Sequence, residues 1–490
     1  MNKQQQSILL DVLAEQRTGE EPLPLGVDLD GTLVKTDTLI ESILILLKQQ
    51  PLLFFAMFWW ALRGKAYFKQ QIADRVDLPA ATLPYHSGFL NYLREEFQNG
   101  RKLVLATAAN QKVAHAVADH LGIFAEVLAS DHSTNLSGKR KLEELEQHFG
   151  KKGFHYAGNG LVDLPIWTGA AAGVVVNAPS GLVRSAKNKA NITQVFPTKK
   201  RSFKHFIKAI RVHQWVKNLL IFVPLLTSHT YTNPQLTIQA IWAFFAFSFC
   251  ASSVYLLNDL LDLEVDRQHA KKRNRPFAAG DLSLKTGLFA FPLLVIPSFL
   301  IAFNLNPYFL ATLATYYVIT FAYSFHLKRL ALVDVFTLAL LFTLRIFSGA
   351  AAIDVVVSQW LFAFSIFIFT SLAFVKRYAE LKNLPKDKAA VGGRGYLSED
   401  VFIIGNFGIA SAYISVVVFA LYIHSEQVEL LYDHPQRLWG ICVLLFFWVS
   451  RVWLLAFRGS LNEDPILFAV KDKTSFVVGF LAAITIFLSV

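Results

Sequence analysis

Four polar side chains stand close together at the end of a strongly apolar run. In VYLLNDLLDLEVDRQHAKKRNRP, residues 254–276, they are Asn258, Asp259, Asp262 and Asp266. On an α-helix these positions share one sector, because residues four apart lie on nearly the same face. Three crowded carboxylates need a neutralising cation, and Mg²⁺ commonly bridges carboxylates to substrate phosphates. The pattern therefore predicts a Mg²⁺ site for a phosphorylated substrate; an acidic helix end without such a role is the alternative.

A second carboxylate pair, Asp28 and Asp30, lies in PLGVDLDGTLVKTDTL, residues 24–39, directly after a short apolar stretch. Two carboxylates two residues apart can divide the work of phosphate chemistry, one attacking phosphorus and the other handling protons. Further polar candidates follow later apolar stretches or open a helix, and they are Thr107, Lys141, Asn159 and Asp163. Because predicted strands and helices alternate here, we expect a parallel α/β sheet with its chemistry at the carboxyl ends of the strands.

The elements that must hold these residues differ between two parts of the chain. Of the 490 residues, 54% are hydrophobic and 17% are charged, and the mean hydropathy is +0.40, which indicates membrane spans. Residues 1–200 have the mixed composition of a globular domain, whereas residues 215–490 are mostly long apolar runs. We predict nine transmembrane helices, the first short or re-entrant. Their runs centre near 215–230, 237–257, 284–303, 307–325, 331–351, 358–376, 401–423, 436–457 and 474–490.

Lysine and arginine gather in alternate connections between these runs, which predicts that those connections face the cytoplasm. The basic connections include Lys272, Arg275, Lys328, Lys376, Lys386, Lys388 and Arg394. The first 24 residues lack the apolar core of a signal peptide, so we expect the N-terminal domain and the acidic cluster on the cytoplasmic side of a bacterial inner membrane. The basic loops account for the net charge of +11 and give little support to nucleic-acid binding. Cys250 and Cys442 lie inside apolar runs and predict neither a disulfide nor a zinc site.

Two segments of the N-terminal part have unusual compositions. The run PLLFFAMFWWAL is too short to span a membrane, and Lys48, Arg63 and Lys65 flank it. This composition favours a helix lying in the membrane interface, and an ordinary buried helix is the alternative. Residues 181–206 are rich in lysine and arginine and are predicted to form a basic linker near anionic headgroups.

The motifs around Asp28, Thr107, Lys141 and Asp163 resemble, in this order, those of the haloacid dehalogenase (HAD) phosphatases. The resemblance implies a Rossmann-like domain over residues 1–180 with a helical cap over about 36–100. It implies that Asp28 is the nucleophile, Asp30 the acid and base, and Thr107 and Lys141 the groups that orient phosphate. One Mg²⁺ would be held by Asp28, Asp30, Asn159 and Asp163. Asn159 stands where the family usually has an acid, so a degenerate domain that only anchors or regulates remains an alternative.

The spacing Asn258-Asp259-x-x-Asp262-x-x-x-Asp266 resembles the first aspartate-rich motif of the UbiA superfamily of intramembrane prenyltransferases. The resemblance covers residues 207–490 and implies nine helices around a polar cavity. It also implies that Asp259, Asp262 and Asp266 are catalytic residues that bind one or two Mg²⁺ ions and a diphosphate. Where a second aspartate-rich motif is usual, this chain has FVKRYAELK, with Lys376 and Arg377. Cations at this place suit direct binding of a second phosphorylated substrate.

The segments QWVKN, NDLLDLEVDRQHAKKRNRP, YSFHLKR and FVKRYAEL together resemble the decaprenyl-phosphate phosphoribosyltransferase branch of this superfamily. That branch transfers 5-phosphoribose from phosphoribosyl pyrophosphate (PRPP) to a polyprenyl phosphate and releases pyrophosphate. The residues that would bind substrates are Lys217, Asn258, Lys272, Arg275, Tyr323, Lys328, Arg345, Lys376 and Arg377. For Arg345, which lies inside an apolar run, the alternative is a structural ion pair with Asp334.

Together, the two resemblances imply a bifunctional membrane enzyme. The phosphatase would remove the 5-phosphate from the transferase product and leave polyprenyl-phosphoryl-ribose for cell-envelope glycan synthesis. The alternative is an aromatic prenyltransferase of the UbiA type with an accessory or degenerate HAD domain, and the missing second aspartate-rich motif counts against it.

Overall fold

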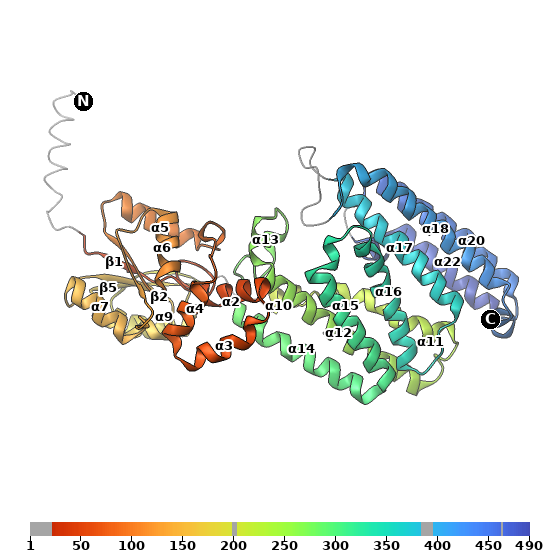
Figure 1. The fold of residues 1–490 in the computed structure, drawn as a ribbon, viewed down its shortest axis with the longest axis horizontal. Coiled ribbons are helices and arrows are strands. Elements are labelled where there is room, and N and C mark those ends of the chain that lie inside the picture. The colour runs from red at the N-terminus through yellow and green to blue at the C-terminus, as the bar shows by residue number, and fades with distance from the viewer. Residues whose placement is uncertain (1–21, 198–202, 384–394, 462–463) are drawn as a thin grey trace, which may run out of the picture. The chain divides into compact units, whose positions relative to one another are not determined.

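The computed structural model describes residues 22–197, 203–383, 395–461 and 464–490. Contacts between residues divide the chain into two compact units. Figure 1 labels the helices and strands that form them. The first comprises residues 1–209 together with 259–288, and the second comprises 210–258 together with 289–490. The acidic segment that follows Asn258 thus packs with the N-terminal part, which the sequence analysis did not predict. The basic residues Lys386, Lys388 and Arg394 lie outside the described residues.

The first unit is built on the predicted parallel sheet. Its strands are β1 (Leu25–Val27), β2 (Leu103–Asn110), β3 (Glu126–Ser130), β4 (His155–Gly158), β5 (Ala172–Val176) and β6 (Ile192–Phe196). They run in the order β3-β2-β1-β4-β5-β6, and every neighbouring pair is parallel. The connecting helices are α6 (Gln111–Leu121), α7 (Lys139–Phe149), α8 (Leu164–Gly169) and α9 (Ser180–Lys189). The order changes direction at β1 and β4, where ligand sites commonly form at the carboxyl ends of the strands.

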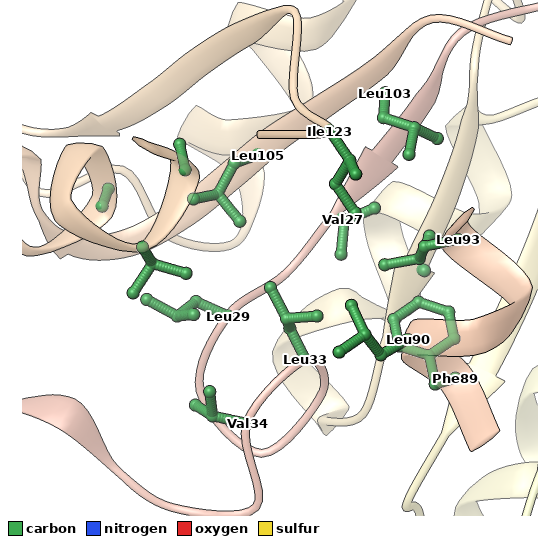
Figure 2. Packing of buried hydrophobic residues seen from close by; sticks show 14 of the residues in the cluster. Val27, Leu29, Leu33, Val34, Phe89, Leu90, Leu93, Leu103, Leu105 and Ile123 are labelled. Carbon is green, nitrogen blue, oxygen red and sulfur yellow. The ribbon is translucent and has the colours of Figure 1, made fainter. Parts of the chain in front are cut away.

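A helical cap lies between β1 and β2 in the sequence. It consists of α2 (Thr38–Gln49), α3 (Leu53–Leu62), α4 (Lys65–Ala73) and α5 (Ser87–Gln98). Val27 and Leu105 of the central strands pack with Leu29, Leu33 and Phe89 of α5 in one apolar cluster (Figure 2). Buried parallel strands are apolar on both faces, which explains why the polar residues of this unit gather only where the strands end.

The predicted linker over residues 181–206 is wrong for most of its length. Residues up to Lys189 form α9, and Ile192–Phe196 form the sixth strand of the sheet. Leu182 and Ala186 lie four residues apart and are buried, so α9 packs one apolar stripe and leaves its basic side chains exposed. The high charge concealed this amphipathic pattern. Residues 198–202 of the predicted linker lie outside the described part of the chain.

Seven helices of the described chain are long and apolar enough to cross a membrane, and the count is eight if a bent pair forms one span. Five of them are α12 (Pro234–Leu261), α14 (Leu284–Leu305), α15 (Pro307–Phe325), α16 (Val333–Ala352) and α17 (Gln359–Lys382). The other two, Ser398–Ile423 and Pro435–Phe457, contain α18 (Val401–Ile423) and α20 (Trp439–Phe457) together with the 3₁₀ turn before each helix. The bent pair is α21 (Pro465–Lys471) and α22 (Lys473–Ser489), at 79°. The nine predicted helices are therefore not confirmed, although the chain does contain a multi-span helical domain.

The first predicted span, near 215–230, does not form a long helix. Val212–Phe222 form a 3₁₀ helix, which passes into the short helix α11 (Val223–Thr227). A side chain at Gly349 of α16 would collide with the backbone of Ile221, so the 3₁₀ helix lies directly against α16. This close approach positions Lys217 and Asn218 beside the buried residues of α16.

Candidate active sites

The carboxylate of Asp28 lies directly after β1 and is held from two sides. Lys141, in the first turn of α7, places Nζ 2.7 Å from Asp28 Oδ1, and the Thr32 hydroxyl donates to Oδ2 at 3.3 Å. Both Asp28 and Lys141 are buried. Lys141 also donates to the hydroxyl oxygen of Tyr156 at 3.0 Å. The predicted nucleophile and the predicted phosphate-orienting lysine thus meet at the carboxyl end of the sheet.

Asp163 shapes the loop after β4. Its Oδ2 accepts the backbone N–H groups of Asn159 and Gly160 at 2.9 and 2.8 Å, and its Oδ1 accepts the Tyr156 hydroxyl at 3.0 Å. Burial, followed by the nearby Asp28 charge, raises the pKa of Asp163. The Asn159 amide lies against Gly31, where φ is +76° and an added Cβ would collide with it. Asn159 therefore borders the loop that carries Asp28 and Asp30.

Asp30 accepts a hydrogen bond from the start of the cap, and its pKa is raised. Its Oδ1 accepts the backbone N–H of Thr38 at 2.8 Å. Burial, with the Asp37 and Asp28 charges adding to it, raises the pKa of Asp30 from 3.8 to about 7. A carboxyl group whose pKa is close to neutral can both donate and accept a proton near pH 7. This agrees with the acid and base role that the HAD resemblance implies.

The cap adds a cation that the sequence analysis missed. Lys69 of α4 donates to the backbone oxygen of Ala108 at 2.5 Å and to Asn135 Oδ1 at 2.7 Å. Burial lowers the pKa of Lys69, although the Asp30 and Asp37 charges oppose that change. Thr107, inside β2 and three residues before its end, is buried, and its hydroxyl oxygen accepts the N–H of Ala109 at 3.0 Å. No sequence motif marks Lys69, because only the fold of the cap brings α4 to the end of β2.

The spacing of the acidic motif predicted one continuous helix, but the motif is divided between two helices. Helix α12 ends at Leu261, Asp262 lies at the break, and Asp266 belongs to the short helix α13 (Leu263–Gln268). Arg275 nevertheless joins the two parts, with Nη1 3.0 Å from Asp259 Oδ1 and 2.6 Å from Asp266 Oδ2. Asp262 Oδ1 lies 2.6 Å from the ammonium of Lys48, in α2. Cationic side chains thus neutralise the crowded carboxylates, whereas Lys272 is exposed.

In the second unit, two predicted cations converge on a carboxylate that the sequence analysis missed. Lys217 Nζ lies 2.7 Å from Asp464 Oδ2, and Lys376 Nζ lies 3.6 Å from the same oxygen. The Lys217 ammonium also lies over the ring of Phe342, 5.6 Å from its centroid. Two lysines around one carboxylate form a cationic group suited to a phosphate oxygen. Asp464 stands in a loop shortly before the last apolar run and resembles no motif.

The two remaining arginines differ in what they bind. Arg345 donates to Asn218 Oδ1 at 2.9 Å and to the Tyr316 hydroxyl oxygen at 3.0 Å, so the proposed ion pair between Arg345 and Asp334 is not formed. Arg377 takes that place, with Nε 2.7 Å from Asp334 Oδ2. Arg377 is 1% exposed and also pairs with Glu380. Binding of substrate by Arg377 would require it to exchange these contacts, and that role stays a prediction.

The other predicted substrate-binding residues of this unit are less enclosed. Tyr323 and Lys328 are partly exposed, near the carboxyl end of α15 and just after it. Asn258 donates from its amide nitrogen to the Ser324 hydroxyl at 2.9 Å. These contacts bring the end of α12 to the end of α15.

Comparisons with known proteins support both parts. A model of the UbiA prenyltransferase family matches residues 220–455, and a model of the haloacid dehalogenase-like hydrolases matches residues 25–166. The decaprenyl-phosphate phosphoribosyltransferase of Mycolicibacterium smegmatis is 30% identical over 277 residues, which cover 54% of this chain and 86% of that protein. The chain belongs to the UbiA prenyltransferase family. Its N-terminal part is a HAD domain.

One relative matches nearly the whole chain, and one solved structure is similar to part of it. The uncharacterized protein y4nM of Sinorhizobium fredii is 37% identical over 471 residues, covering 95% of this UbiA protein and 90% of the relative. The UbiA homolog of Archaeoglobus fulgidus bound to GPP and Mg²⁺ has a TM-score of 0.42 and 17% identity, covering 58% of this chain and 98% of that one.

Neither predicted ligand set of this UbiA protein forms a ready metal cluster. Among the described residues, no group of three or more His, Cys, Asp or Glu side chains is arranged to hold a metal ion. Lys141, Arg275 and Lys48 contact carboxylates of these two sets. Metal binding by Asp28, Asp30, Asn159 and Asp163, and by Asp259, Asp262 and Asp266, stays a prediction. The donor chemistry still fits Mg²⁺, since two carboxylates converge on one nitrogen of Arg275 and hard oxygen ligands suit that ion.

Proposed function

We propose that this protein transfers 5-phosphoribose from PRPP to a polyprenyl phosphate and then removes the 5-phosphate from the product. The observation that carries the proposal is the coverage of 86% of a decaprenyl-phosphate phosphoribosyltransferase by the membrane part of this chain. The HAD domain in the same chain belongs to a family of hydrolases, and it would catalyse the removal of the 5-phosphate. The final product would be polyprenyl-phosphoryl-ribose, a pentose donor for cell-envelope glycans.

For the transfer, the acidic motif would receive the pyrophosphate end of PRPP. One or two Mg²⁺ ions bound by Asp259, Asp262 and Asp266 would offset the charge of the leaving pyrophosphate. Lys217 and Lys376 would exchange their contact with Asp464 for phosphate oxygens of the substrates. The acceptor phosphate is already an anion and attacks the anomeric carbon, so the reaction needs no separate base.

For the hydrolysis, Asp28 would attack the phosphorus of the 5-phosphate, and Asp30 would protonate the departing 5-oxygen of ribose. Water, giving its proton back to Asp30, would then cleave the aspartyl phosphate, which releases inorganic phosphate and frees Asp28. The pKa of Asp30 near 7 supplies that proton at neutral pH. Lys141 would stabilise the phosphoryl oxygens, and one Mg²⁺ at Asp28, Asp30, Asn159 and Asp163 would offset their charge. Thr107 would orient the same group.

A lipid substrate requires the phosphatase to work at a membrane, and α3 supports this. Phe55, Phe58 and Trp59 are 73%, 61% and 61% exposed, so the alternative of a buried cap helix does not fit. An exposed helix of this composition suits the membrane interface. We further propose, from the alternation of basic loops, that the HAD domain and both sites face the cytoplasm at a bacterial inner membrane. Nine membrane crossings stay a prediction.

The deciding experiment supplies purified protein with radiolabelled PRPP, Mg²⁺ and a polyprenyl phosphate, and separates the lipid products by chromatography. We expect a dephosphorylated ribosyl lipid from the wild type, its phosphorylated form from Asp28→Asn, and no labelled lipid from Asp262→Ala. Label that never enters lipid would reject phosphoribosyl transfer, and prenyl diphosphates with an aromatic acceptor would then be tested. Accumulation of the phosphorylated lipid with the wild type would reject the phosphatase step.

A further inference from the structure

A buried ion pair in the first unit joins the cap to the segment that carries the acidic motif. Arg267 donates from Nη1 and Nη2 to the two carboxylate oxygens of Glu41, at 2.9 and 2.5 Å. The two side chains are 8% and 4% exposed. The Thr36 hydroxyl donates to Glu41 as well, at 2.5 Å. Such a bidentate pair sets orientation as well as distance, and losing one partner would leave a buried charge uncompensated.

Arg267 connects this pair to the carboxylates of the acidic motif. It directly follows Asp266 in the sequence, and its Nε donates to the backbone oxygen of Ala278 at 3.1 Å. The guanidinium therefore ties together the two limbs of the loop over residues 262–285. Between these limbs, Arg275 holds Asp259 and Asp266. Glu41 thus anchors the loop whose geometry brings the carboxylates together.

The remaining contacts extend along one face of α2. Asp37, Glu41 and Lys48 are spaced so that their side chains lie within about 40° of one another around the helix. Each meets a residue of opposite charge from the loop: Asp37 meets Lys285 at 3.3 Å, Glu41 meets Arg267, and Lys48 meets Asp262 at 2.6 Å. The matched order of charges fixes the register of the loop on α2.

We propose that this face of α2 is the docking surface for the acidic-motif loop and that Glu41 is a positioning residue for phosphoribosyl transfer. Through Arg267, Glu41 holds Asp266 and Asp262 where the diphosphate of the donor binds. The HAD domain then serves the transferase site in addition to its own reaction. The inference rests on the proposed function for its chemistry, whereas the docking itself can be tested without any substrate.

The substrate-free test is limited tryptic digestion of the full-length protein in detergent. Lys271, Lys272 and Arg273 are exposed in the loop and provide the cleavage sites. We expect Glu41→Gln and Arg267→Lys to raise the cleavage rate at these sites about tenfold or more, because coupling within one ion-pair network is of that size. Glu96→Gln is the matched control, since Glu96 pairs with Arg101 at 2.7 Å elsewhere in the same unit. Wild-type cleavage rates in both loop variants would overturn the docking.

The second test measures transfer kinetics on the same proteins. We expect the KM for PRPP to rise about tenfold or more in Glu41→Gln and Arg267→Lys, with a smaller change in kcat, because ligand positioning is lost rather than a reacting group. Hydrolysis of a soluble phosphomonoester by Arg267→Lys should stay within about twofold of the wild type. An unchanged KM in both variants would overturn the positioning role. If the wild type transfers no phosphoribose, the proposed function fails, and the digestion still decides whether the loop docks on α2.

If Glu41→Gln does not fold, Arg267→Lys decides the outcome. It keeps the positive charge but loses the second hydrogen bond to Glu41, so it disturbs the pair without leaving Glu41 unpaired. Thermal unfolding of each variant, measured beside the wild type, identifies which proteins are folded. A folded Arg267→Lys protein with wild-type cleavage and wild-type KM would be sufficient to reject the proposal.

Discussion

Lys141 Nζ lies 2.7 Å from Asp28 Oδ1, although 113 positions separate the two residues in the chain. The pair is buried at the carboxyl ends of β1 and the following strands, where α7 presents its first turn to the sheet. A buried ion pair of this kind is costly to break from one side only. It therefore allows a test that separates stability from catalysis.

Replacing Lys141 by Met should lower both the phosphatase activity and the stability. The unpaired Asp28 should cost about 3–5 kcal/mol of the free energy of unfolding, and the loss of a cation at the phosphoryl group should lower kcat about 10²–10³-fold. Hydrolysis of a soluble phosphomonoester and thermal unfolding measure the two effects. The double variant Asp28→Asn/Lys141→Met should regain much of the stability but no activity. Lys139→Met, on the exposed side of α7, is the matched control.

Asp30→Asn should gain stability over the wild type as the pH rises towards 7. Because burial raises the pKa of Asp30 from 3.8 to about 7, the folded state keeps a proton in this window that the unfolded state has released. The free energy of unfolding of the wild type therefore falls with rising pH and levels off above 7. The full shift corresponds to at most about 4 kcal/mol, and the partial exposure of Asp30 reduces this.

Thermal unfolding at pH 5 and pH 8, with a chelator present, measures this difference. Asp119→Asn, in which an exposed carboxylate of α6 is replaced, serves as the control. If the difference in unfolding temperature between Asp30→Asn and the wild type were the same at both pH values, the raised pKa of Asp30 would be contradicted.

Lys217→Met should weaken phosphoribosyl transfer through substrate binding. A charge-assisted hydrogen bond is worth about 1.5–3 kcal/mol, so the KM for a phosphorylated substrate should rise about tenfold to a hundredfold. Lys376→Met should act in the same direction, because both ammonium groups approach Asp464 Oδ2. Transfer of label from PRPP at several substrate concentrations checks this. Lys473→Met removes an exposed cation of α22 and should leave the KM unchanged.

Phe55→Ser should impair hydrolysis of a lipid phosphate but not of a soluble one. Withdrawing a large apolar side chain from a membrane interface costs about 1.5–3 kcal/mol. We therefore expect about a tenfold loss or more on the lipid-linked substrate in vesicles. Phe97→Ser is the matched control, since Phe97 is also exposed but lies in α5. Equal losses on both substrates would argue that α3 acts on folding instead of membrane contact.

The parallel sheet and the apolar spans were predictable because their signals are local. The apolar run before Asp28 marks the end of β1, and long apolar runs mark helices. The run before Thr107 marks a strand as well, but β2 continues to Asn110. Asp464, Lys69 and Glu41 were missed because each acquires its role only through a partner far away in the sequence. The ion pair of Arg377 was missed for the same reason, because its partner Asp334 lies on a neighbouring helix.

The break of the acidic motif at Asp262 was also beyond the sequence. Helical spacing from Asn258 to Asp266 is ideal, yet the chain turns between α12 and α13. Periodicity shows which residues would share a face if the helix continued, but it does not show where tertiary contacts interrupt the helix. Here the contacts of Asp262 with Lys48 and of Arg267 with Glu41 are made on both sides of that turn.

The packing of residues 259–288 with the N-terminal unit has a consequence for biogenesis. The ribosome synthesises all residues of the six-stranded sheet and its cap before it reaches residue 259. Domains generally fold as units, the N-terminal one first during synthesis. When the acidic loop is synthesised, α2 is already folded, and its charged side chains can pair with those of the loop and act as a template for its folding. A shortened chain that starts after residue 209 would synthesise the same loop without that template, with Arg267 facing no Glu41.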